Sequence, residues 1–114
     1  MSIRRHIVLY DDSAAGNGEW FRLDSRYEET PERAIQITVS GGDSVTIQAT
    51  TKDTRGPNPD TGLAFNPDTD LDPDDITALI VYNADENDIL TGNWTYIRVV
   101  KAGTAANAKV QGYI

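Results

Sequence analysis

Apolar and polar residues alternate along much of the chain. Residues 34–40 and 44–49 each place an apolar side chain at every second position, a period typical of strands with one buried face. Between them lies Ser40-Gly41-Gly42-Asp43, and glycine supplies the positive φ that a tight hairpin turn needs. We therefore predict a β-hairpin over residues 34–50 with these side chains facing the core: Ile35, Ile37, Val39, Val45, Ile47 and Ala49.

Other short segments with strand character are predicted at residues 3–9, 18–24, 76–82, 93–101 and 108–114. Residues 77–82 are apolar on both faces, which indicates a central strand covered on both sides. A short helix is the alternative there, because Asp74 and Asp75 are suited to capping it. No segment shows a sustained apolar stripe of helical period. About six to eight short strands predict an all-β fold, an antiparallel β-sandwich or jelly roll.

The length of 114 residues corresponds to one domain. We expect a single β-sandwich over residues 1–114, in which residues 1–9 form an N-terminal arm or an edge strand. Residues 53–75 contain four of the five prolines and many aspartates. Proline cannot donate to a strand ladder and aspartate favours turns, so this segment predicts a long acidic loop. Within it, residues 63–65 (Leu-Ala-Phe) are candidates to anchor the loop to the body.

Charge narrows the possible partners. The chain carries 18 acidic and 10 basic residues, a formal net charge of −8. This balance argues against nucleic acid and against anionic membranes, both of which attract basic surfaces. We expect no signal peptide in the first ten residues, and no apolar run approaches the ~20 residues of a membrane span. The absence of cysteine excludes disulfides and thiolate metal sites.

Candidate chemistry is sparse. Alternating aspartates in Asp68–Asp75 are the one cluster that suggests a hard cation such as calcium. A proline stands where an EF-hand loop needs glycine, so a solvated acidic loop with a capping aspartate is the competing interpretation. His6 is the only histidine and is expected at the surface. No nucleophile elbow or phosphate-binding glycine pattern occurs. We therefore expect no enzyme activity, no cofactor and no metal.

Aromatic and arginine residues mark a candidate partner interface. If the core faces of their strands are Phe21 with Leu23 and Ile97 with Val99, the alternate residues point away from the core. Those residues are of the types that dominate interface energetics. Two interpretations remain open: the tryptophans cap the core, or they form a partner-facing patch. The candidate interface residues are Arg4, Arg5, Trp20, Arg22, Trp94, Tyr96 and Arg98.

Three stretches carry a resemblance to a known group of proteins. They are IQITVSGGDSVTIQA (residues 35–49), WTYIRVVKAGT (94–104) and AKVQGYI (108–114). Together with Gly18-Glu19-Trp20, they resemble small β-sandwich proteins of tailed bacteriophage particles, namely capsid decoration (cement) proteins and related head- or tail-associated domains. The resemblance covers roughly half of the chain. The central Pro/Asp loop departs from the short connection expected in such proteins.

The resemblance implies a non-catalytic virion protein on the outer surface of a phage head, made in the host bacterial cytoplasm. It implies the major capsid protein as partner and a homo-oligomer, with a trimer favoured. The N-terminal segment with Arg4 and Arg5 would then add to a capsid subunit by strand pairing. The alternative is a tail or baseplate adhesion module, in which Trp20, Trp94 and Tyr96 stack on host glycans. A small carbohydrate hydrolase is a third hypothesis, because such enzymes need only two carboxylates.

Overall fold

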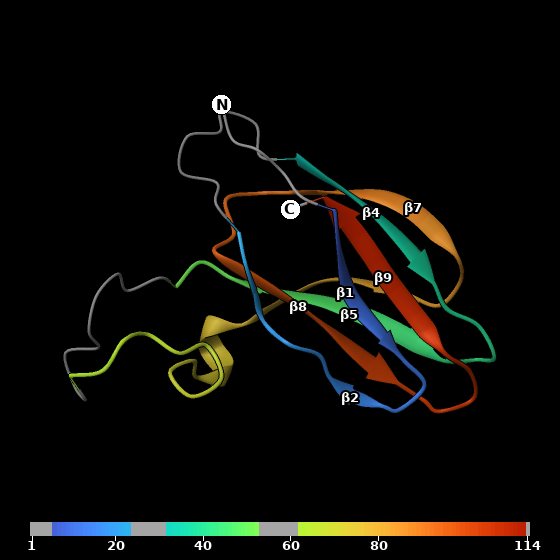
Figure 1. The fold of residues 1–114 in the computed structure, drawn as a ribbon, viewed down its shortest axis with the longest axis horizontal. Coiled ribbons are helices and arrows are strands. Elements are labelled where there is room, and N and C mark those ends of the chain that lie inside the picture. The colour runs from blue at the N-terminus through green and yellow to red at the C-terminus, as the bar shows by residue number, and fades with distance from the viewer. Residues whose placement is uncertain (1–5, 24–31, 53–61, 114) are drawn as a thin grey trace.

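The computed structural model describes residues 6–23, 32–52 and 62–113. Within them the chain forms two antiparallel sheets, which pack face to face (Figure 1). Sheet A has the order β1-β9-β4-β7, and sheet B has the order β2-β8-β5-β6, with β3 also pairing with β8. The all-β sandwich predicted from the sequence is confirmed. The elements are β1 (His6–Asp12), β2 (Gly16–Asn17), β3 (Phe21–Arg22), β4 (Glu32–Thr38), β5 (Ser44–Thr50), a 3₁₀ turn (Pro73–Asp75), β6 (Thr77–Tyr82), β7 (Glu86–Thr91), β8 (Tyr96–Ala102) and β9 (Ala108–Tyr113).

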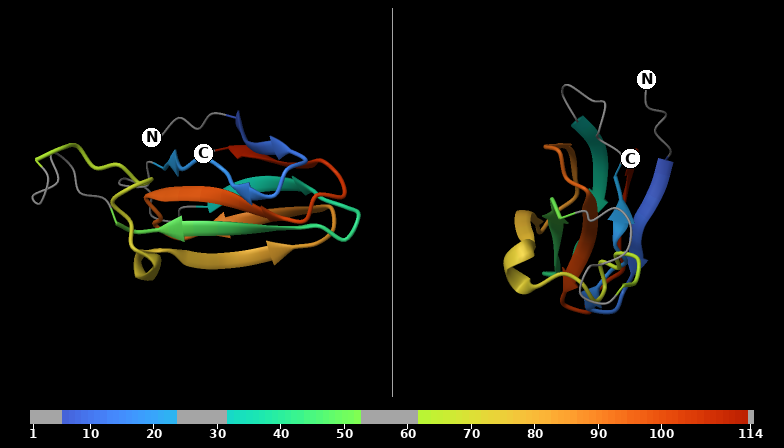
Figure 2. Two further views of the ribbon diagram at one scale, coloured as in Figure 1. Left: turned by 90° about the horizontal axis from the view of Figure 1, so that it is seen from below. Right: turned by 90° about the vertical axis from the view of Figure 1, so that its left-hand side faces the viewer.

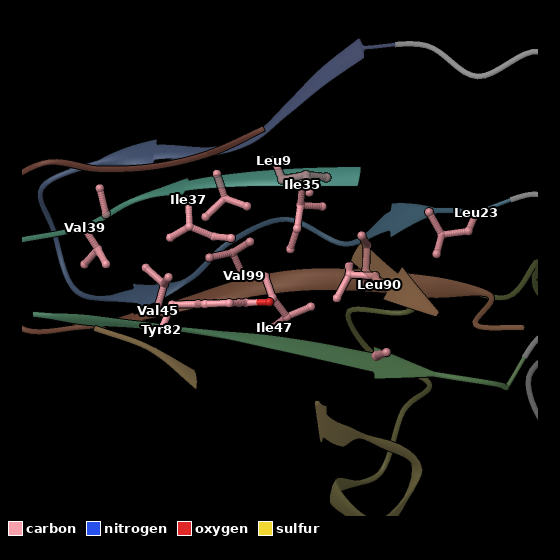
Figure 3. Packing of buried hydrophobic residues seen from close by; sticks show 14 residues of the cluster. Leu9, Leu23, Ile35, Ile37, Val39, Val45, Ile47, Tyr82, Leu90 and Val99 are labelled. Atoms are coloured by element: carbon pink, nitrogen blue, oxygen red, sulfur yellow. The ribbon is translucent and has the colours of Figure 1, made fainter. Parts of the chain in front are cut away.

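The core lies between the two sheets, where the apolar faces of their strands meet (Figure 3). The alternation in β4 and β5 produces the predicted burial, because every predicted core side chain of these strands is less than 4% exposed. Removing such apolar surface from water is the main force that holds two stacked sheets together. The other buried apolar residues are Leu9, Leu23, Tyr82, Leu90, Tyr96, Ile97, Val99, Ala108 and Val110.

The hairpin predicted over residues 34–50 is wrong, although both of its strands are present. β4 pairs with β7 and β9 in sheet A, whereas β5 pairs with β6 and β8 in sheet B. The turn with Gly41 and Gly42, at φ +72° and +82°, therefore carries the chain from one sheet to the other. A period of two gives each strand a buried face, but it does not distinguish pairing within a sheet from packing across the core.

The prediction that residues 77–82 form a central, covered strand is also wrong. β6 is a strand and not a helix, but it stands at the end of sheet B. Val81 is 63% exposed and Ile80 37% exposed. Asp75 belongs to the 3₁₀ turn that precedes the strand, and its carboxylate accepts a hydrogen bond from the Asp72 N–H. The apolar residues on both faces of β6 therefore belong to an exposed edge strand and not to a covered central one.

The remaining strands differ from the predicted bounds in smaller ways. Residues 18–24 contribute only the two-residue strand β3, and the separate two-residue strand β2 precedes it on β8. β7 was not predicted, because the segment ENDILT has only two apolar residues, which are adjacent, so that Leu90 is buried and Ile89 is exposed. β1 is an edge strand of sheet A, as one of the two interpretations of residues 1–9 proposed. Among the described residues, no helix is long and apolar enough to cross a membrane.

A buried ion pair joins three turns at one end of the sandwich. Lys101 Nζ donates to Asp43 Oδ2 at 2.9 Å, to Ser13 O at 3.0 Å and to Gly103 O at 2.6 Å. The same Asp43 carboxylate accepts the backbone N–H groups of Ala105 and Ala106. Burying a charge is costly unless it is paired and hydrogen-bonded, and here all three ammonium protons have acceptors. Asp43 and Lys101 are 58 positions apart in the chain, so no short sequence pattern indicates that they form an ion pair.

Candidate functional site

The structure separates the predicted interface residues into several environments. Arg4 and Arg5 lie outside the described residues. Trp20 and Arg98 meet directly, because the Arg98 guanidinium carbon lies 4.5 Å from the centroid of the Trp20 ring. Arg22 is exposed on β3, opposite Tyr96 in the strand register. The residues therefore do not form one continuous patch.

Tyr96 does not point to solvent, which contradicts the predicted outward orientation. It is only 9% exposed, and the ring of Phe65 covers it at a centroid separation of 5.6 Å. Phe65 thus anchors the loop to the body, as predicted, whereas Leu63 is 69% exposed and Ala64 is also exposed. The alternation correctly placed Tyr96 on the side of its strand away from the core, but Phe65, from a loop distant in the sequence, covers it there.

The position of Trp94 agrees with the interpretation that the tryptophans cap the core. It packs against the hydrophobic core as a partly buried residue. Its indole N–H donates to Thr91 O at 2.9 Å across the tight turn at Gly92. An aromatic residue that is held at both its apolar and its polar end closes the core, and Trp94 is not among the residues that line the groove at Trp20.

Trp20 and Arg98 border a groove on the outer face of sheet B. Its volume is about 430 Å³, within the ~300–1,000 Å³ range of small-molecule sites. One wall comes from the sheet and the other from residues 67–76 of the acidic loop. The lining residues are Trp20, Gln48, Pro67, Asp68, Leu71, Pro73, Ile76, Ala78 and Arg98.

Arg98 is fixed in orientation within this groove. Its Nε donates to Gln48 Oε1 at 2.8 Å, while its guanidinium lies over the Trp20 ring. Burial lowers the pKa of Arg98 from its usual value, and the negative charge of Asp68 opposes that shift. An arginine stays protonated at any ordinary pH, so the groove contains a positive and a negative side chain that partly balance each other.

The loop wall of the groove is held by short-range hydrogen bonds. Asp70 Oδ2 accepts the Asn66 N–H at 2.9 Å, and Asn66 Oδ1 accepts the Asp68 N–H at 3.0 Å. Lys52 Nζ reaches Asp75 Oδ2 at 3.2 Å and Asp70 O at 3.1 Å. The hydrogen bond from the Asp72 N–H, with that from Lys52, lowers the pKa of Asp75. These aspartates therefore organise the loop that faces the groove.

The acidic segment does not assemble a cation site from the residues that the structure describes. No group of three or more histidine or carboxylate side chains converges there or elsewhere in residues 6–23, 32–52 and 62–113. The carboxylates of Asp70 and Asp75 instead accept hydrogen bonds within the loop. The competing interpretation, a solvated loop with a capping aspartate, describes this arrangement.

The outer face of sheet A is a second surface, which the sequence analysis did not single out. One row of side chains crosses all four strands in register: Val8, Gln111, Gln36 and Asn87. The Gln111 amide donates to Gln36 Oε1 at 2.9 Å, so these two amides are partly satisfied by each other.

A neighbouring row on the same face is more apolar. His6 pairs with Tyr113, and their rings meet edge to face at 5.3 Å, while Ala34 pairs with Ile89. The small Ala34 leaves a shallow hollow of about 540 Å³ between larger neighbours. Gly112 lies beneath it, where a side chain would collide with Ala34 O. His6 is exposed, as predicted.

Three of the six large apolar side chains that are exposed among the described residues lie on this outer face. Val8 is 41% exposed, Tyr113 53% and Ile89 54%. Val8 and Ile89 lie on the two edge strands of sheet A and Tyr113 lies on a central one, so a partner that covers this face would contact all three side chains. Little in the sequence indicates this surface, because Ile89 lies on β7, which was not predicted, and Tyr113 follows Gly112, which interrupts the alternation. We refer to Val8, Ile89, Tyr113 and the hollow at Ala34 as the sheet A face.

Comparisons with known proteins add no further identification: no protein-family model, no curated protein and no solved structure matches this chain.

Proposed function

We propose that this chain is a non-catalytic phage-head decoration protein that binds the major capsid protein through the sheet A face. The observation that carries the proposal is the exposure of Val8, Ile89 and Tyr113 on one side of a sheet. Tyrosine is among the residue types that supply most of the affinity in protein interfaces, and burial of the aliphatic side chains adds to it. A sheet also holds them in fixed positions, which reduces the entropy lost on binding.

The amides on the same face suit a protein partner as well. Gln36 and Gln111 satisfy each other only in part, and Asn87 continues their row. Amide side chains both donate and accept hydrogen bonds, so they complement backbone groups of a partner. Gln111 and Gln36 lie on the two central strands, while Val8 and Ile89 lie on the edge strands, so the face offers a partner both polar and apolar contacts.

The proposal extends to assembly and location. A trimer would present three sheet A faces together, and the affinity of linked sites for a repetitive shell exceeds that of one site. The formal net charge of −8 favours solubility at high copy number in the bacterial cytoplasm before assembly. The outer surface of the phage head is the location that follows from binding to assembled capsid protein.

The alternative, an adhesion module of a phage tail or baseplate, is less well supported in its original form. Tyr96 is buried and Trp94 packs against the core, so neither side chain is placed to stack on a sugar ring. Of the three aromatic residues in that hypothesis, Trp20 is the one that lines a groove.

Binding to heads tests the proposed function. Purified protein is added to heads of the phage that encodes it, prepared from a strain in which its gene is deleted. We expect saturable binding and greater resistance of the heads to heat. If the protein does not bind these heads, or if the gene stands in no phage genome, the proposal is wrong.

A matched pair of variants locates the binding surface. Ile89→Lys adds a charge to the sheet A face, and Val81→Lys makes the same type of change at the exposed edge of sheet B. We expect Ile89→Lys to lower head affinity by about a hundredfold, in the range of an interface hot spot. Val81→Lys should bind as the unmodified chain does, while both variants keep their thermal stability.

A further inference from the structure

The groove at Trp20 combines an aromatic ring with polar side chains. The Trp20 indole N–H and the Asp68 carboxylate make no hydrogen bond to any described residue. Gln48 uses its carbonyl oxygen for Arg98, which leaves its amide N–H groups directed away from that contact. The groove thus offers donors from Trp20, Gln48 and Arg98, and an acceptor from Asp68.

The rest of the lining is apolar. Pro67, Leu71 and Pro73 form the loop wall, and Ile76 and Ala78 continue it toward β6. A ligand for this groove must therefore have C–H surfaces for the aromatic and aliphatic walls. It must also carry groups that both donate and accept hydrogen bonds.

We propose that this groove binds a neutral saccharide, with a sugar ring against the part of Trp20 that Arg98 does not cover, and with Asp68 and Arg98 hydrogen-bonded to its hydroxyl groups. A sugar ring has C–H faces that pack on aromatic rings, and each hydroxyl donates and accepts. The charges of Arg98 and Asp68 oppose each other in the same groove, so a ligand with no net charge fits better than an anionic one.

The site is independent of the sheet A face. Sheet A and sheet B form opposite layers of the sandwich, so their outer faces point in opposite directions (Figure 2). A molecule docked by the sheet A face would leave the groove accessible on its other side. Failure of head binding and failure of saccharide binding are therefore separate results.

Titration with neutral oligosaccharides tests the proposal directly. The probes are glucose-, galactose- and N-acetylglucosamine-based hexasaccharides, with a sialylated and a sulfated oligosaccharide for comparison. Binding is measured by calorimetry, and by indole fluorescence in Trp94→Phe, where Trp20 is the remaining tryptophan. We expect at least one neutral probe to bind with a dissociation constant below about 1 mM and to change the Trp20 emission.

Variants of the lining residues identify the site. Trp20→Ala should lower the affinity for that probe by roughly tenfold or more, since aromatic anchors dominate small interfaces. Asp68→Asn should lower it by about threefold to tenfold, while the isosteric control Asp74→Asn, outside the groove, leaves it unchanged. Tyr113→Ala is the control for an exposed aromatic residue on the opposite sheet.

Three results would overturn the proposal. One is that no neutral probe binds at about 1 mM. Another is that the sialylated or sulfated probe binds more tightly than every neutral one. The third is that a neutral probe binds but keeps its affinity in a Trp20→Ala variant whose circular dichroism and melting temperature show it to be folded.

Discussion

The two outer faces of the sandwich follow the same strand alternation and yet differ in what they present. On sheet A, the outward side chains of four strands remain open, and Val8, Ile89 and Tyr113 reach solvent. On sheet B, residues 62–76 return alongside the strands, so that Phe65 covers Tyr96 and the loop wall encloses Trp20. A broad face that mixes exposed apolar and amide side chains suits a protein partner, whereas a walled groove with balanced charges suits a small polar ligand.

The strand pattern therefore determines which side chains point outward, and the connections between strands determine whether those side chains stay accessible. The long acidic loop is the main cause of the asymmetry. Its own aspartates hold its turns, and Lys52 attaches it to the end of β5 through Asp75. If this account is correct, damage to the loop affects one face only, while damage to the shared core affects both.

Ile47→Ala should have the largest effect, because Ile47 is fully buried between the two sheets. A large-to-small core substitution costs about 3 kcal/mol, which lowers the melting temperature by roughly 10–15 °C in a domain of this size. Thermal unfolding followed by circular dichroism measures it. Head binding and saccharide binding should fall together at a temperature where the variant is partly unfolded. Loss at one face alone would contradict a shared core.

Acid should lower the stability of the fold by less than Ile47→Ala does. It should act on the ion pair of Asp43 with Lys101, at the end of the sandwich where turns from both sheets meet. The hydrogen bond from Lys101, with those from the Ala106 and Ala105 amides, holds the pKa of Asp43 below its usual value of 3.8. A depressed pKa contributes stability that is complete above 3.8 and is lost as the pH falls through the folded-state value.

Melting temperatures between pH 6 and pH 2 measure this contribution. The melting temperature should stay level down to about pH 5 and then fall. Asp43→Asn should flatten this acid limb more than Asp75→Asn does, because Asp43 is buried in the ion pair while Asp75 is in part exposed. Equal effects of the two substitutions would remove the special role assigned to the Lys101 pair.

Phe65→Ala should have the smallest effect on global stability. It should change ligand binding at the outer face of sheet B but not at the sheet A face. The tilted Phe65–Tyr96 pair is worth about 1 kcal/mol by analogy with other aromatic pairs. Losing it should weaken saccharide binding at Trp20 by releasing the loop wall, and leave head binding unchanged. Native-state hydrogen exchange should show faster exchange in residues 62–75 only, and faster exchange in β4 or β9 would contradict this division.

Much of the fold was predictable, because alternation is a direct consequence of strand geometry. The pattern correctly placed Ile35 and Ile37 of β4, Val39 directly after it, and Val45 and Ile47 of β5 in the core. Their pairing was not predictable from the same pattern. β4 has β7 on one side and β9 on the other, so no edge of β4 remains for β5 to pair with. β5 therefore lies in the other sheet and faces β4 across the core.

The candidate sites were predicted less well, because they depend on contacts between distant residues. The contact of Trp20 with Arg98 and the burial of Tyr96 under Phe65 join segments more than 30 residues apart. The sheet A face needs the register of four strands, one of which, β7, has too few apolar residues to be recognised. Residue type alone identified Trp20 and Arg98 as candidates but did not show that they share a groove.

Electron cryomicroscopy of heads decorated with this protein would show which outer face of the sandwich meets the capsid. We expect density in which Val8, Ile89 and Tyr113 contact the shell, while the groove at Trp20 opens away from it. Density with the Trp20 groove against the capsid, or with the sheet A face turned to solvent, would contradict the assignment of the two faces.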